Sequence, residues 1–88
     1  MRQAPEHFGD QELCLVYVAR KLKDSLRLEE FLTSQGIDYL VEPDKYTVGA
    51  IFRTERVGAF FYVGPNDDDA TRAAMRQGGF RPFTESHE

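Results

Sequence analysis

The sequence predicts a small α+β domain in which two helices lie on one face of a mainly antiparallel sheet. Three observations lead to this class. Short runs rich in β-branched and aromatic residues alternate with two segments of helical periodicity along the 88 residues. Their order is strand, helix, strand, strand, helix, and residues 80–83 can add a short last strand. A right-handed crossover between the first two strands then gives a ferredoxin-like split βαβ sandwich.

The length and composition are those of one folded domain. A chain of 88 residues buries roughly 60–65% of the surface that its unfolded form exposes, so one sheet and two helices fill its core. Hydrophobic residues make up 41% of the chain, which is enough for that core. We expect one domain over residues 12–83, with residues 1–11 and 84–88 as loose polar tails.

The first strand and the first helix follow from local pattern. Residues 13–19, LCLVYVA, are short and rich in β-branched and aromatic side chains, as is typical of a buried strand. The next segment has helical spacing, with Asp24 or Ser25 as its N-cap. The apolar face of this helix is made by Leu28, Phe31 and Leu32.

A glycine ends the first helix and leads into the second strand. Gly36 can take the left-handed position after the helix, and Ile37 can pack back on Leu32, as a Schellman ending requires. Residues 37–42, IDYLVE, then alternate between the two faces of a strand. The PDKY motif that follows predicts a turn at Pro43.

An apolar ribbon, YTVGAIFRTERVGAFFYV, predicts a hairpin with strands at residues 47–53 and 57–63. We expect its charged RTERVG segment to form the turn. Arg53, Glu55 and Arg56 then keep the turn in water and discourage pairing between the edges of two sheets.

The residues after the Gly64-Pro65 pair predict the second helix. Asn66 or Asp67 is expected as its N-cap, and the aspartates that follow suit the positive end of the helix dipole. The small residues expected to face the sheet are Ala70, Ala73 and Ala74. Gly78 and Gly79 end the helix, and the proline in residues 80–83 restricts a last strand to an edge of the sheet.

Two stretches give the chain a resemblance to a known family. FLTSQGIDYLVE joins the first helix to the second strand through a Gly-Ile pair, and FFYVGPNDDDATRAAM joins the hairpin to the second helix. Over residues 12–78 the chain resembles the small bacterial domains called prokaryotic signal-transducing proteins, whose fold is compared with the nitrogen-regulatory PII-like proteins. The resemblance implies a self-associating regulatory or binding module, and it transfers no catalytic residues. The long nucleotide-binding loop of PII proteins has no counterpart here.

Charge and hydropathy argue against two classes of partner. The 11 basic residues against 15 acidic residues give a net charge of -4, whereas nucleic-acid binding needs a net basic face. No apolar run approaches the ~18 residues of a membrane span. The first eleven residues lack the apolar stretch of a secretory signal. We therefore expect a cytoplasmic protein without nucleic-acid or membrane partners.

The sequence favours neither an enzyme nor a metal site. Cys14 lies inside the first strand without a CxxC partner or a core histidine, and we expect a buried, reduced thiol. His7 and His87 lie in the two tails, outside any metal-binding spacing. Helix capping explains the acidic run at residues 66–69, because consecutive residues at a helix start point in different directions and no DxDxDG loop follows. We expect no catalysis, no metal and no cofactor.

Basic residues mark a candidate anion site. Arg20, Lys21 and Lys23 precede the expected helix, whose free amide groups and dipole favour anions. Arg53 and Arg56 can add bidentate donors if the fold brings them close. The alternative is that all five are solubilising residues at strand ends, since the sequence has no glycine-rich phosphate loop.

Aromatic residues mark a candidate interface. The run AFFYV is apolar on both alternating sets, so its strand is either central in the sheet or part of an interface. The candidate interface residues are Phe52, Phe60, Phe61 and Tyr62. A sheet with helices on one face leaves the other face open, and an exposed apolar face is typical of interaction sites. The full RNP1 pattern that an RNA-binding sheet would carry is absent.

Two functions follow from these residues. The first is a non-enzymatic regulatory or protein-interaction module that forms a homodimer or another homo-oligomer, or binds another protein, through an aromatic sheet face. The second is a sensor of small anions or phosphorylated metabolites that uses the basic loop before the first helix.

Overall fold

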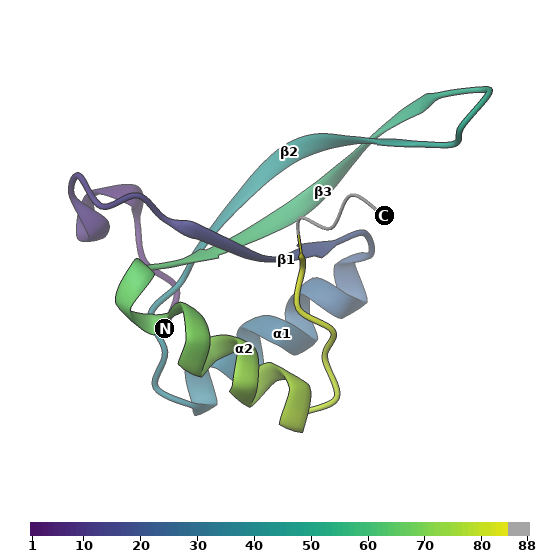
Figure 1. Cartoon of the computed structure of the whole chain (residues 1–88). Coiled ribbons are helices and arrows are strands. Elements are labelled where there is room, and N and C mark those ends of the chain that lie inside the picture. The colour runs from purple at the N-terminus through teal and green to yellow at the C-terminus, as the bar shows by residue number, and fades with distance from the viewer. Residues whose placement is uncertain (85–88) are drawn as a thin grey trace.

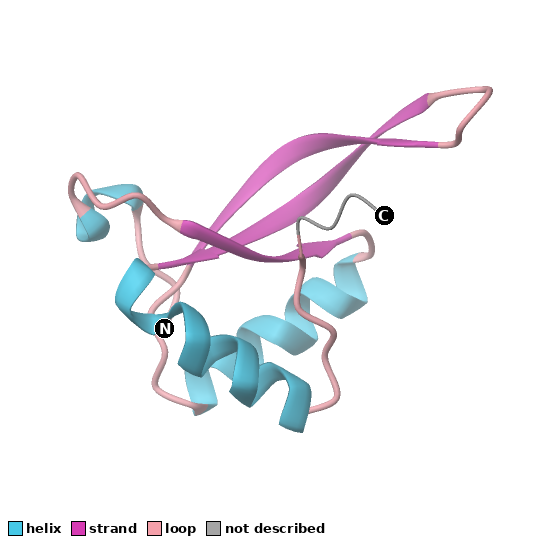
Figure 2. Cartoon of the chain, viewed as in Figure 1, coloured by secondary structure: helices cyan, strands magenta, loops and turns pink. Residues whose placement is uncertain are grey.

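The computed structural model describes residues 1–84 and has two α-helices packed on one face of a three-stranded antiparallel sheet (Figures 1 and 2). The strands are β1 (Cys14–Ala19), β2 (Leu40–Val48) and β3 (Thr54–Val63). The helices are α1 (Leu22–Ser34) and α2 (Asp68–Gln77), and the short 3₁₀ turns are η1 (Pro5–Phe8) and η2 (Pro65–Asp67). The predicted α+β class, with both helices on one face, is confirmed.

The central strand of the sheet is β3. The order across the sheet is β1-β3-β2, and both neighbours pair with β3 in the antiparallel sense. Consequently β1 and β2 are parallel to each other, on either side of β3, and α1 connects them. The AFFYV run lies in this central strand, which is paired along both of its edges.

An aromatic row fills the space between the sheet and the helices. Phe61 on β3 is fully buried, and its ring centroid lies 5.9 Å from that of Tyr39 and 6.3 Å from that of Tyr17. The row continues from Tyr17 to Phe80 at 6.2 Å, and from Phe80 to Phe31 of α1 at 5.2 Å. Each such pair contributes about 0.5–1.5 kcal/mol beyond the area it buries. The row therefore joins two strands, one helix and the segment after α2.

The glycine-based helix ends were predicted correctly. Gly36 has φ 72°, and the amide of Ile37 donates to the carbonyl of Leu32 at 3.0 Å, which is the Schellman arrangement. The second helix ends in the same way, with Gly79 at φ 88° and the amide of Phe80 bonded back to the helix at 2.8 Å. Both endings turn an apolar side chain back toward the core.

Two other predictions about the helices are wrong. α1 begins one turn early, with Lys21 at the N-cap, because the amide of Ser25 donates to the carbonyl of Lys21 at 3.1 Å and so places Asp24 inside the first turn. α2 buries Thr71 and Met75 instead of its alanine face. The alanines left exposed or half-exposed are Ala70, Ala73 and Ala74. Burying Met75 removes more apolar area from water than burying an alanine would.

The β2–β3 hairpin is longer than predicted and turns at a different place. β2 continues through Pro43, because β2 is an edge strand, where a residue without an N–H is tolerated. The turn falls at residues 49–53, and RTERVG lies mostly within β3. Gly49 has φ 94°, and a Cβ atom there would lie 2.5 Å from the carbonyl oxygen of Phe52. Only glycine fits this turn, so the turn is fixed at that position.

The far half of this hairpin has no third strand. β1 pairs with β3 only from Ala59 to Val63, so residues 44–58 form a two-stranded ribbon that we call the hairpin arm. The arm projects beyond the helices (Figure 1). Because a two-stranded ribbon by itself is marginally stable in water, the arm gains stability from any surface that packs on it.

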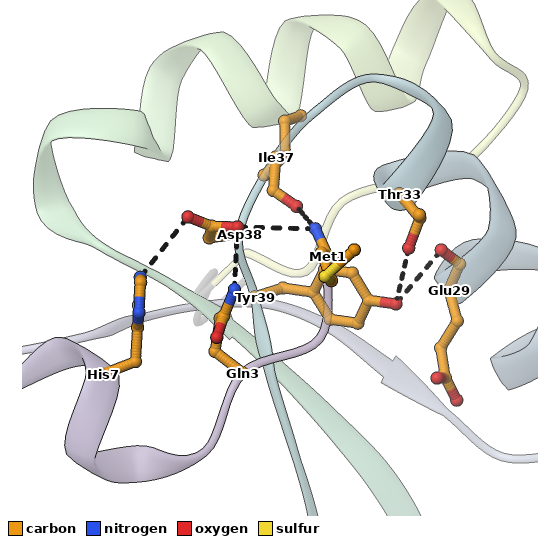
Figure 3. Close-up of polar contacts among 8 residues, drawn as sticks. All are labelled: Met1, Gln3, His7, Glu29, Thr33, Ile37, Asp38 and Tyr39. Atoms are coloured by element: carbon orange, nitrogen blue, oxygen red, sulfur yellow. Dashed lines mark hydrogen bonds and ion pairs between the residues drawn. The ribbon is translucent and has the colours of Figure 1, made fainter.

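The N-terminal residues expected to be a loose tail are bonded to the start of β2 (Figure 3). The amide of Gln3 donates to the carbonyl of Tyr39 at 2.8 Å, and Phe8 is buried. The Gln3 side chain donates to Asp38 at 3.2 Å, and His7 Nε2 lies 3.3 Å from the same carboxylate. Residues 1–8 therefore act as a strap across residues 37–39, directly before β2.

Tyr39 links this strap to α1 (Figure 3). Its side chain is 2% exposed, and its hydroxyl donates to the carbonyl oxygen of Glu29 at 3.1 Å. The hydroxyl also lies 3.1 Å from Thr33 Oγ1. Nearby, the N-terminal amino group donates to the carbonyl of Ile37. A buried polar group that is bonded in this way costs little free energy.

The predicted short last strand is not formed in the described part of the chain. Residues 80–84, which we call the C-terminal segment, run beside β1, and the amide of Phe83 donates to the carbonyl of Val16 at 2.7 Å. Pro82 has no N–H to donate, so it does not extend this pairing. Beyond Thr84, the expected C-terminal tail lies outside the described residues.

Replacing Phe61 by alanine is expected to lower the free energy of unfolding by about 3–5 kcal/mol, because a cavity would open in the middle of the aromatic row. Phe60→Ala is the matched control, since Phe60 is the half-buried neighbour on the opposite face of β3, and we expect it to cost about 1–2 kcal/mol. Urea unfolding monitored by circular dichroism measures both values. Equal losses would contradict the assignment of the two residues to different faces.

The strap predicts a pH dependence of stability. The pKa of the Asp38 carboxyl lies below its ordinary value, because Gln3 donates a hydrogen bond to it and because the N-terminal amino group and His7 lie close by. A carboxyl group of lowered pKa stabilises the fold above its unfolded pKa, and this contribution is lost as the pH falls through the folded pKa. Since the carboxylate is 43% exposed, we expect a contribution below about 1 kcal/mol.

Asp38→Asn is therefore expected to lower the Tm at neutral pH, by less than about 8 °C. The difference from the unchanged protein should disappear as the pH falls through the lowered pKa of Asp38, because the protonated carboxyl group is then uncharged like the asparagine. Asp10→Asn, on the exposed turn after η1, is the control. A difference in Tm that stays constant between neutral and acid pH would show that the Asp38 charge does not stabilise the strap.

Candidate functional site

A groove of about 510 Å³ lies at the base of the hairpin arm. Its walls come from β1, from the first residues of the arm on β2 and from the C-terminal segment. The cationic and aromatic side chains that line it are Arg20, Lys45, Arg81, Tyr17, Tyr46, Phe60 and Phe83. Among the described residues that line it, none is acidic. We call it the basic groove.

The groove adjoins the sheet face that the helices leave uncovered. Phe61 and Val63 belong to the core beneath β3. Because side chains alternate along a strand, Phe60 and Tyr62 lie on the opposite face. Neither α1 nor α2 covers that face (Figure 2). We call it the open face.

A cation–π contact fixes one wall of the groove. The guanidinium carbon of Arg20 lies 5.2 Å from the ring centroid of Tyr46. Gly58 leaves space for this ring, since a Cβ atom at Gly58 would lie 3.0 Å from the Tyr46 ring and 2.9 Å from the carbonyl oxygen of Ala19. Tyr46 is also the cross-strand partner of Arg56. Two arginines therefore flank one tyrosine at the base of the arm.

The structure brings together only part of the predicted anion site. Of the five predicted residues, Arg20 alone lines the basic groove, and Arg56 lies next to it beside Tyr46. Lys21 lines a second groove of about 320 Å³, which it shares with Arg20. Lys23 is exposed in the first turn of α1, and Arg53 is exposed at the tip of the arm. The five candidate residues do not converge on one site, because the long hairpin carries Arg53 away from the helix.

Sequence reasoning missed Lys45 and Arg81 as groove residues. Lys45 was assigned to a turn, whereas it lies within β2. The alternation of IDYLVE does not place it in the groove, because it sets Lys45 on the face of Val41, opposite to Tyr46 and Phe60. Lys45 lies 3.9 Å from Glu55, but both side chains are 70% exposed, so this ion pair is weak. No local signal placed Arg81 there, because its position depends on how the chain turns after α2.

The predicted aromatic interface also needs a correction. Phe61 is fully buried in the aromatic row, so it contributes to the core instead of to an interface. Phe60 and Tyr62 are half-buried on the open face. Phe52 lies at the tip of the arm and is 88% exposed, beside Ile51, which is 84% exposed and was not predicted.

The open face carries charges of both signs. The pKa of Tyr62 is raised by burial first, and then by the charges of Asp44 and Glu42. Glu42 is the cross-strand partner of Phe60, and Asp44 that of Gly58, so both acids lie on the open face along β2. Arg20 follows β1, but its guanidinium lies over the Tyr46 ring of β2. Acidic and basic groups therefore lie close together at the β2 side of the face.

Arg72 of α2 holds the C-terminal segment in place. Its Nε donates to Asp68 Oδ1 at 2.7 Å, and its Nη2 donates to the carbonyl of Leu15 at 2.8 Å. Its Nη1 donates to the carbonyl of Phe83. Because these bonds join α2, β1 and the C-terminal segment, Arg72 positions one wall of the basic groove.

Cys14 lies in a cavity of about 870 Å³ that Asp68 and Arg72 also line. The thiol is half-buried and unpaired. Its pKa is raised by burial first and by the charge of Asp68 second, although Arg72 acts in the opposite direction. A raised pKa keeps the side chain in its thiol form, which is a poor nucleophile.

Residues 1–84 contain no group of three or more His, Cys, Asp and Glu side chains arranged to hold a metal ion. No helix among them has the length and the apolar composition that crossing a membrane requires.

Comparison with known proteins adds no assignment. No protein-family model, curated protein or solved structure matches the chain. The function must therefore be argued from the basic groove, the open face and the hairpin arm.

Replacing Arg72 by methionine is expected to lower the free energy of unfolding by about 2–3 kcal/mol, because three backbone and side-chain acceptors lose a charged donor. Arg76→Met is the matched control, since Arg76 is exposed one turn further along α2. Thermal unfolding measures both, at roughly 4–8 °C per kcal/mol. A similar decrease in the two variants would mean that Arg72 does not stabilise the packing of the C-terminal segment.

Proposed function

We propose that this protein is a non-enzymatic regulatory or protein-interaction module of the cytoplasm, and that it forms a homodimer through the open face and the hairpin arm. The exposure of the arm tip carries this proposal. Ile51 and Phe52 are 84% and 88% exposed at the end of a ribbon without a third strand. Large apolar side chains gathered at such a projection are typical of interaction surfaces.

The apolar residues at the centre of the open face also favour a homodimer contact there. Phe60 and Tyr62 on β3 lie there, and Val18 on β1 is the cross-strand partner of Phe60. All three are half-buried in the single chain. Packing a second sheet on them would remove their remaining apolar area from water, at about 25 cal/mol per Å².

One arrangement of the two copies brings both arms together. A two-fold axis parallel to the strands would set β1 of one copy over β2 of the other. The same axis points both arms in one direction, so the two tips, each with Ile51 and Phe52, would lie together. Such a contact is isologous, as in most homodimers.

We also propose that the domain has a ferredoxin-like fold. The order β1-β3-β2, with α1 crossing between the two parallel strands, is three-quarters of a ferredoxin-like sheet. The C-terminal segment lies beside β1, where the fourth strand of that fold would be. We assign the domain on this basis to ferredoxin-like modules of the signal-transducing type that the sequence resembles.

The proposal predicts a dimeric mass in solution at micromolar concentration. In a double variant, Ile51→Ser with Phe52→Ser, the dimer should dissociate at least tenfold more readily, because two exposed side chains lose their apolar contacts. The fold of the single chain should be unchanged, since neither side chain is buried in it. Sedimentation equilibrium measures the dissociation constant, and circular dichroism checks the fold.

Leu26→Ser is the matched control for this experiment. Leu26 is 56% exposed, but it lies on α1, on the other side of the sheet. Its replacement should leave the dimer unchanged. A monomeric mass for the unchanged protein at high concentration would end the homodimer proposal and leave an unlike protein as the partner of the arm.

A further inference from the structure

We infer that the basic groove binds a small phosphate ester that carries a planar ring. The groove is complete in one copy of the chain, so this inference does not rest on the proposed homodimer. Its volume of about 510 Å³ is that of a small-molecule site. Three features of the groove favour such a ligand: its positive charge, its aromatic walls and the contacts that hold its side chains in position.

Positive charge gathers in the groove, and no acidic side chain of residues 1–84 lines it. Arg20, Lys45 and Arg81 come from three separate segments of the chain and converge on one space. Among residues 1–84, neither Arg20 nor Arg81 forms an ion pair, and the pair of Lys45 with Glu55 is exposed and 3.9 Å long. Cations that face the same space repel one another, and a bound anion removes that repulsion. A phosphate accepts bidentate bonds from the planar end of an arginine.

The walls between these cations are aromatic. Tyr46 and Phe60 come from the hairpin, and Phe83 comes from the C-terminal segment. All three are half-buried, so part of each ring faces the groove or the solvent. A planar ring can stack on such side chains. An inorganic anion would use only the charges, whereas a ring joined to a phosphate uses the charges and the walls.

The groove is organised before any ligand arrives. The cation–π contact with the Tyr46 ring holds the Arg20 guanidinium in position. The lack of a side chain at Gly58 leaves room for that ring. On the other side, Arg72 and the bond from Phe83 to Val16 fix the C-terminal segment. A site whose side chains are already positioned loses less conformational entropy on binding.

Two matched pairs of compounds test the inference: FMN with riboflavin, and AMP with adenosine. Each pair shares a ring and differs in the phosphate, and inorganic phosphate alone supplies the anion without a ring. We expect at least one of the two esters to bind with a Kd below about 1 mM in low salt. Its affinity should exceed that of its phosphate-free partner, and that of inorganic phosphate, by at least tenfold. Isothermal titration calorimetry, with FMN fluorescence as a second readout, measures these values.

Variants locate the site. Arg81→Gln should weaken binding of the ester at least tenfold, and it removes an exposed residue that has no role in the fold described above. Tyr46→Leu should weaken binding of the ester and leave the weaker binding of inorganic phosphate less affected. Arg76→Gln, on the exposed side of α2, is the control and should have no effect.

Three results would overturn the inference. The first is that neither ester binds below about 1 mM. The second is equal affinity for ester and phosphate-free compound, and the third is an equal effect of Arg81→Gln and Arg76→Gln. Phe60 and Val18 line the groove and also lie at the centre of the proposed dimer contact, so the titrations are repeated with the double variant Ile51→Ser with Phe52→Ser and the native mass is recorded on the same samples. A monomeric variant that binds no ester rejects only the ligand site, and a monomeric mass for the unchanged protein rejects only the homodimer.

Discussion

The packing of Phe61 on the central strand is the interaction on which the rest of this structure depends. A sheet of three strands has only one that is paired on both sides, and that strand must supply the middle of the core. The Phe61 ring packs against Tyr17 on β1 and against Tyr39, directly before β2. Tyr17 in turn packs against Phe80, and the Tyr39 hydroxyl donates a hydrogen bond to a backbone carbonyl of α1. Because Phe61 points to the helices, Phe60 and Tyr62 must point to the other face, and the open face follows directly from the period of the strand.

Both edges of this small sheet are partly covered by other segments of the chain. Strand edges with free backbone groups pair readily with other chains. At one edge, residues 1–3 pair with Tyr39, and at the other, Phe83 bonds to Val16. Beyond the pair of Ala19 with Ala59, β1 ends and the hairpin arm continues as two strands. The part of the described sheet that lacks a third strand is therefore also well placed to contact another molecule.

The basic groove arises from the same arrangement. It lies where the arm leaves the three-stranded part of the sheet and where the C-terminal segment passes β1. Three segments meet there, and each contributes one cation. Such a meeting point of separate segments is where small-molecule sites commonly occur, since no single element fills the space. The acidic side chains Glu42 and Asp44 lie along the neighbouring strand, so the charge of the face changes sign over a short distance.

The sequence by itself determined the α+β class, the order of the elements and the glycine-based helix ends, because these depend on local periodicity and on backbone conformation at Gly36 and Gly79. Only the tertiary structure decided the rest. The hairpin turn moved to Gly49 because β2 is an edge strand, which tolerates Pro43, and this position in the sheet is not a local property. The face that Phe61 occupies, the convergence of Arg20 with Arg81 and the exposure of Phe52 all depend on contacts between residues far apart in the chain, which local patterns do not encode.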